Sequence, residues 1–117
     1  MLLGLLAFAS IALAASAGTA ATPAATTNVS VSEREWSIVL GRIKAPRGTI
    51  VLNIRNFGQD DHNVAIRKHG VQYAFSGRIL AGESKTISVK LGPGVYNVIC
   101  TLPGHRSLGM ATRLTVT

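Results

Sequence analysis

From residue 29 onward, apolar and polar positions alternate along the chain with a period of two. Residues 50–55, "IVLNIR", and residues 86–91, "TISVKL", each carry large aliphatic side chains at every second position. Successive side chains of a strand point to opposite faces of a sheet, so this alternation predicts strands with one buried face. No stretch of this region shows the longer period that is typical of an amphipathic helix.

Short turn-forming segments separate the predicted strands. They contain Gly, Pro, Asn or Asp, which tolerate positive φ or fix a bend in the chain. These segments are "APRG" (45–48), "NFGQDD" (56–61), "LAGES" (80–84), "GPG" (92–94) and "LPGH" (102–105). Several short strands joined by such turns predict an all-β domain over residues 28–117, an antiparallel Greek-key β-sandwich or barrel.

The N-terminal part of the chain has a different composition. Residues 1–20 contain no charged side chain and are almost wholly apolar or small, which is typical of a secretory signal peptide. No basic residue stands near the start, so an uncleaved membrane anchor is the second interpretation. Residues 21–27 are predicted to be a linker. Both interpretations place the domain outside the cytoplasm, either periplasmic or secreted, or anchored to a membrane on its extracytoplasmic side.

The chain is strongly basic, with a formal net charge of +7, and every charged residue follows the linker. This charge does not predict nucleic-acid binding, because the longest Lys/Arg run is Arg67-Lys68 and no aromatic side chains are interleaved with basic ones. The composition indicates a solvated basic surface that suits acidic proteins or anionic lipid headgroups.

The segment "CTLPGHRSLGM" (100–110) contains the only cysteine of the chain, with one of its three histidines and one of its two methionines. In an oxidising compartment an unpaired cysteine indicates an intermolecular disulfide or a thiol kept for its chemistry. The alternation places Cys100, Met110 and the upstream His62 at the same parity as the buried positions of their strands. His105 falls in the loop and is predicted to lie nearer the surface.

Thiolate, thioether and imidazole together form a donor set for a soft or intermediate metal. Two histidines and one cysteine with a weak axial methionine are typical of blue copper, whereas structural zinc favours four strong ligands. An inert buried Cys100 is the alternative. A nucleophilic Cys100–His105 pair would need an orienting group and an oxyanion site that no motif indicates, so we do not predict an enzyme. His69 is predicted to be a solvated loop residue, and Trp36 and Tyr96 are predicted to fill the core.

Three stretches resemble the cupredoxin family, the type 1 blue copper proteins: "NFGQDDHNVAI", "LAGESKTISVKLGPG" and "GVYNVICTLPGHRSLGMATRLTV". The resemblance implies one type 1 copper ion with His62, Cys100 and His105 as equatorial ligands and Met110 as the axial ligand. It also implies that Asn63 ties the two ligand-bearing segments together without touching the metal. In some members a backbone carbonyl at the position of Asp61 contacts copper.

The function implied by the resemblance is single-electron transfer between redox partners. His105, with Leu102, Pro103 and Leu108 around it, is then the electron-transfer port, framed by apolar side chains. We expect a monomer whose partners are cytochromes or a terminal oxidase or reductase with an acidic docking face. Two alternatives stay open, a copper chaperone or storage protein and a metal-free β-sandwich that acts as an assembly module.

Overall fold

The computed structural model describes residues 9–14 and 25–117. Most of the predicted signal or anchor segment, and most of the predicted linker, lies outside these ranges. Residues 9–14 have no regular secondary structure. Within the described ranges, no helix has the length and apolar character needed to cross a membrane.

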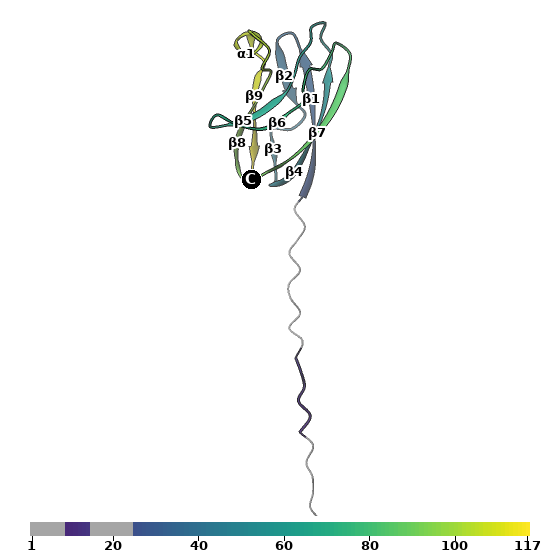
Figure 1. The fold of residues 1–117 in the computed structure, drawn as a ribbon, viewed down its shortest axis with the longest axis vertical. Coiled ribbons are helices and arrows are strands. Elements are labelled where there is room, and N and C mark those ends of the chain that lie inside the picture. Colours follow the sequence, from purple (N-terminus) through teal and green to yellow (C-terminus); the bar gives the residue numbers. More distant parts are fainter. Residues whose placement is uncertain (1–8, 15–24) are drawn as a thin grey trace, which may run out of the picture.

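Two β-sheets pack against each other to form a β-sandwich (Figure 1). The first sheet has the strand order β2-β1-β4-β7 and the second has the order β3-β9-β8-β5-β6. The first sheet consists of β1 (Ala25–Arg34), β2 (Ser37–Leu40), β4 (Gly48–Asn56) and β7 (Ser84–Leu91). The second consists of β3 (Lys44–Ala45), β5 (Ala65–Lys68), β6 (Val71–Phe75), β8 (Gly94–Ile99) and β9 (Ala111–Val116). A single helical turn, α1 (His105–Leu108), lies between β8 and β9.

The predicted sandwich is confirmed, and its sheets are mixed rather than wholly antiparallel. β1 pairs in parallel with β4 from Ala25↔Gly48 to Glu33↔Asn56, and β3 pairs in parallel with β9. β1 and β4 are not consecutive, because the chain passes through β2 and β3 between them. β3 belongs to the other sheet, and this crossover between the sheets brings β4 beside β1 in the same direction.

The alternation of side chains explains the core. Ile50, Leu52 and Ile54 on β4 are at most 1% exposed, whereas the positions between them are partly or fully exposed. Burying each of these side chains contributes about 1.5–3 kcal/mol. Ile87 and Val89 follow the same parity on β7 and are only half-buried, because β7 is the edge strand of its sheet. Tyr96 is buried in the facing sheet, as predicted.

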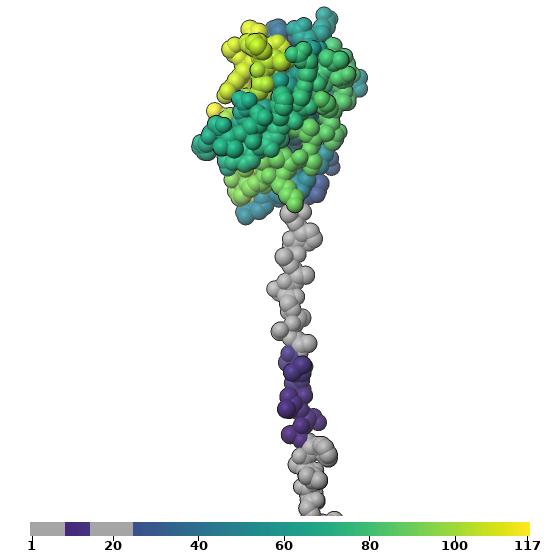
Figure 2. Space-filling model, in the orientation of Figure 1, coloured from purple at the N-terminus to yellow at the C-terminus, as the bar shows by residue number. Residues whose placement is uncertain are grey.

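The two ends of the sandwich have different roles. The start of β1 and the C-terminal Thr117 lie at one end, where Thr117 exchanges backbone hydrogen bonds with Arg47 and Ala45. The loop that contains α1 lies at the opposite end (Figure 1). In the space-filling view this loop, in yellow, forms part of the surface beside the teal segments of the middle of the chain (Figure 2). The predicted ligand segments therefore meet at one end of the domain.

Candidate metal centre

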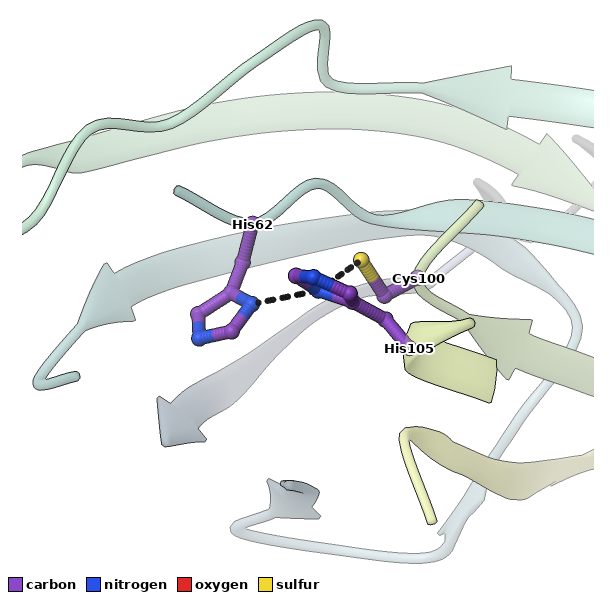
Figure 3. A group of neighbouring side chains, drawn as sticks. All are labelled: His62, Cys100 and His105. Atoms are coloured by element: carbon purple, nitrogen blue, oxygen red, sulfur yellow. Dashed lines mark hydrogen bonds between the residues drawn. The ribbon is translucent and has the colours of Figure 1, made fainter. Parts of the chain in front are cut away.

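His62, Cys100 and His105 come together as predicted (Figure 3). One donor atom from each lies within 4.8 Å of the other two. The Nδ1 atoms of His62 and His105 are 3.2 Å apart, and Nδ1 of His105 is 3.6 Å from Sγ of Cys100. His62 and Cys100 are fully buried and His105 is half-buried, which agrees with the predicted placement of His105 nearer the surface.

His62 is held by the backbone of a neighbouring segment rather than by a regular strand. It lies three residues before β5, and its N–H donates to the carbonyl of Ile79 at 3.0 Å. The N–H of Ile79 donates to the carbonyl of His62 at 2.7 Å. This pair of hydrogen bonds fixes the backbone of His62. The position of the imidazole then depends only on the two side-chain torsion angles of His62.

The loop from Cys100 to Met110 closes on itself. The N–H of Cys100 donates to the carbonyl of Met110, and the N–H of Met110 donates to the carbonyl of His105, both at 3.1 Å. Gly109 has φ 132°, and a Cβ there would lie 2.7 Å from the carbonyl oxygen of Trp36. Glycine is therefore required for the loop to turn against the β1–β2 connection. Met110 is fully buried, as its parity predicts.

Asn63 connects the two segments that carry the ligands. Its Oδ1 accepts a hydrogen bond from the N–H of Thr101 at 2.7 Å, and its Nδ2 donates to Oγ1 of Thr101 at 2.9 Å. Asn63 is 3% exposed, so water competes little for these bonds. The position next to His62 and the bonds to the residue after Cys100 match the bracing role expected from the sequence.

Glu35, which sequence analysis did not select, contacts His62 directly. Its Oε1 lies 3.0 Å from Nε2 of His62 and accepts the backbone N–H of Asp60 at 2.7 Å, while the N–H of Gln59 donates to the same carboxylate at 2.9 Å. These backbone donors, with His62, lower the pKa of Glu35 to about 2. Glu35 stands in the turn between β1 and β2, where the strand alternation is lost, so no pattern indicated this contact.

Trp36 lies at the surface beside the ligands, and its predicted place in the core is wrong. The side chain is 36% exposed, and its ring packs edge-on against His105 with the ring centroids 4.7 Å apart. It occupies the turn between β1 and β2, so it reaches over the end of the sandwich instead of pointing between the sheets. His69 is exposed in the turn between β5 and β6, as predicted.

The surface around His105 is only partly apolar. Pro103 and Leu108 are exposed and Leu102 is half-buried on the ligand-loop side. A hollow of about 430 Å³ beside His105 is lined on its other side by charged residues that include Asp61 and Arg78, which form an ion pair at 3.4 Å. The predicted apolar port thus has a charged border.

A second glutamate is buried beneath the site. Glu33 continues the inward parity of Val29 and Val31 on β1 and is 0% exposed. Among the described residues, neither of its carboxyl oxygens has a hydrogen-bond partner. Burial raises the pKa of Glu33 to about 8. Burial also raises the pKa of the Cys100 thiol, and the nearby charge of Glu33 adds to this effect.

The comparisons with known proteins agree with this site. The family of copper binding proteins, plastocyanin/azurin family, matches over residues 25–117. Rusticyanin from Thiobacillus ferrooxidans has a similar structure, with TM-score 0.70 and 18% identity over 79% of this chain and 77% of that one. The blue copper protein auracyanin A from Chloroflexus aurantiacus has TM-score 0.65 and 16% identity over 80% of this chain and 100% of that one. The reduced auracyanin from Roseiflexus castenholzii has TM-score 0.61 and 20% identity over 82% of this chain and 99% of that one.

None of the curated protein sequences matches the chain. The family match covers nearly all of the described domain, and the chain belongs to the plastocyanin/azurin family of copper binding proteins, the cupredoxins.

The donor set fits the metal of this family. Two imidazole nitrogens and one thiolate sulfur, gathered within 4.8 Å in a mostly buried place, fit one type 1 copper site. The three residues supply one thiolate only, which is fewer than structural zinc sites or iron–sulfur clusters commonly use.

Proposed function

We propose that this protein is an extracytoplasmic single-electron carrier that is not itself an enzyme. The observation that carries the proposal is the convergence of His62, Cys100 and His105 in a member of the cupredoxin family. These residues, together with the buried Met110, would hold one copper ion. Copper bound there would alternate between Cu(I) and Cu(II), which lets it accept and release one electron.

The protein makes the metal site rigid and shields it from water. The loop of residues 100–110 is closed by its own backbone hydrogen bonds, and Asn63 ties it to the segment of His62. His62, Cys100 and Met110 are fully buried, so bulk water does not reach them. A donor set that is already assembled and shielded reorganises little when the charge of a bound ion changes.

The half-buried His105 is the route by which electrons would reach the surface. It lies among Leu102, Pro103 and Leu108, which offer apolar contact to a partner during a brief encounter. We propose that the protein acts as a monomer and that its partners are cytochromes or a terminal oxidase or reductase. The net charge of +7 favours partners with an acidic docking face.

Spectroscopy of the copper-loaded, oxidised domain tests this function. We expect the intense visible absorption of a thiolate–Cu(II) bond and the matching electron paramagnetic resonance spectrum. Cys100→Ser should abolish the visible band and leave the circular dichroism of the sandwich unchanged, because the remaining core residues still fill it. His69→Ala, at an exposed histidine outside the cluster, is the matched control and should keep the band.

A visible band that persists in Cys100→Ser would show that the thiolate assignment is wrong. If the wild-type protein binds Cu(I) tightly but gives no such band after oxidation, the protein is a copper chaperone or store. If it binds no copper at all, the sandwich serves another purpose.

A further inference from the structure

We propose that Glu35 is a positioning residue for the copper site, which holds His62 in the tautomer that presents Nδ1 to the metal. The inference rests on the proposed function, because it assigns a task to a neighbour of the same site. Glu35 Oε1 lies 3.0 Å from Nε2 of His62, on the side of the ring opposite the other ligands. Nδ1 of His62 faces His105 at 3.2 Å.

The loop between β4 and β5 positions the carboxylate of Glu35. Two successive backbone N–H groups, those of Gln59 and Asp60, donate to Glu35 at 2.9 and 2.7 Å. Gly58 precedes them, and a Cβ at this position would collide with the Glu35 carboxylate. Gly58 does not have a positive φ, so space for the carboxylate is the reason for glycine here.

The loop that receives Glu35 is itself fixed. Asn56 is fully buried, its Oδ1 accepts the N–H of Gly58 at 2.8 Å, and its Nδ2 donates to the carbonyl of Asp60 at 2.8 Å. Asn56 therefore holds the loop with its N–H donors directed at the carboxylate. The side chain of Glu35 extends from the β1–β2 turn to the β4–β5 loop and also contacts His62. It therefore links both segments to this histidine.

The chemistry of imidazole makes this contact consequential. A neutral histidine carries one N–H, and a carboxylate beside Nε2 places that hydrogen on Nε2. Nδ1 is then left with its lone pair directed at the space it shares with Cys100 and His105. Carboxylates in such contacts orient metal-binding histidines and raise their basicity. The negative charge also favours the more highly charged Cu(II) over Cu(I), which lowers the reduction potential.

Glu35→Gln tests the proposal because it keeps the size of the side chain and removes the charge. Glu83→Gln is the matched control, since Glu83 also accepts a backbone N–H in a turn, from Leu80 at 3.0 Å, and the substitution changes the net charge equally. The carboxylate of Glu83 does not hydrogen-bond to His62 among the described residues. Two measurements are made on each variant: the histidine tautomers of the copper-free protein by ¹⁵N NMR, and the midpoint potential of the copper-loaded protein.

In the wild type and in Glu83→Gln we expect His62 with its hydrogen on Nε2. In Glu35→Gln we expect a mixture of tautomers, a loss of Cu(II) affinity of about 10–100-fold and a higher midpoint potential. Each tenfold loss of Cu(II) affinity relative to Cu(I) raises the potential by about 59 mV. Gly58→Ala is a second variant that displaces the carboxylate without changing any charge, and we expect it to disturb the tautomer of His62 in the same way.

The proposal is overturned if Glu35→Gln and Gly58→Ala both leave the tautomer of His62 as it is in Glu83→Gln. It is also overturned if the midpoint potential of Glu35→Gln equals that of Glu83→Gln. A wild-type protein without a type 1 spectrum would contradict the proposed function instead, and the NMR comparison would still decide whether Glu35 sets the tautomer.

Discussion

At the scale of single residues, Met110 is the proposed ligand whose contribution is easiest to isolate. It is fully buried, and its N–H bonds the carbonyl of His105, so its backbone belongs to the ligand loop whatever its side chain does. Met110→Leu keeps a buried side chain of similar volume and removes the thioether. We expect copper to stay bound, because the axial bond is weak, and the midpoint potential to rise, because a donor to Cu(II) is lost. Metal analysis and voltammetry measure both quantities, and an unchanged potential or a loss of copper would show that Met110 is not axial.

Glu33 gives the protein a pH-dependent stability. Its pKa is about 8 in the folded protein, against an ordinary value of 4.5. Below pH 4.5 the carboxyl group is protonated in both the folded and the unfolded protein, so it does not lower the free energy of unfolding. Between these values only the unfolded chain releases the proton, so the free energy of unfolding falls as pH rises, by a few kcal/mol in total at about 1.4 kcal/mol per pH unit. This loss is complete above pH 8.

Glu33→Gln removes this dependence, since an amide does not titrate. We expect the free energy of unfolding of the copper-free variant to fall less steeply than that of the wild type between pH 5 and 8, as measured by urea denaturation. Every other ionisable residue is the same in both proteins, so we assign the difference between the two curves to Glu33. Parallel curves would mean that the carboxyl of Glu33 reaches water or a cation in solution.

At the scale of elements, the sequence was informative wherever the alternation was regular. It predicted the inward-facing positions of β4 and β7, because these depend on parity. His62, Cys100 and Met110 are buried as predicted, but residues 62–66 and 98–100 are buried without alternation, so parity alone does not account for His62 and Cys100. Parity carries no information about strand direction, so the parallel pairing of β1 with β4 was not predicted. That pairing depends on how the chain crosses from one sheet to the other.

The contacts made by the turn between β1 and β2 could not be predicted from the sequence. Glu35 and Trp36 lie side by side in this turn. Glu35 contacts His62, and the ring of Trp36 packs edge-on against His105 and, at a greater distance, against His62. In the sequence, a glutamate next to a tryptophan has no periodic context and matches no ligand motif. The contacts exist only because the turn folds over the β4–β5 loop and over α1, which is a tertiary relationship. The resemblance to cupredoxins indicated the ligands and the bracing Asn63, whereas neither pattern nor resemblance indicated the contacts of Glu35 and Trp36.

At the scale of the whole molecule, the distribution of charge controls association. The chain carries +7, whereas three of its five acidic residues, Glu35, Asp60 and Asp61, belong to the neighbourhood of His62 and His105. Distant partners therefore experience a positive field, and partners in contact meet a mixed surface. Charge steering is screened over about 8 Å at physiological ionic strength.

We expect electron exchange with an acidic cytochrome to be faster than with a basic one at low salt, and the two rates to approach each other as salt is added. Second-order rates measured against ionic strength test this expectation. Apolar contact at Leu102, Pro103 and Leu108 should be much less sensitive to salt. Rates that do not change with salt for either cytochrome would assign docking entirely to the apolar side chains.

Ala25 pairs with Gly48, next to the Arg47 that bonds Thr117, so both chain positions lie at the end of the sandwich remote from the ligand loop and are suitable points of attachment. The ten-residue strand β1 alone spans about 33 Å. A support, an electrode or a second domain joined at either point would leave the opposite end, with His105, free to face the solution. An electron could then not pass directly between the support and the nearest end of the protein, and exchange would depend on a mobile carrier arriving at the far end. The fold thus works as a spacer that determines the direction from which a partner can approach.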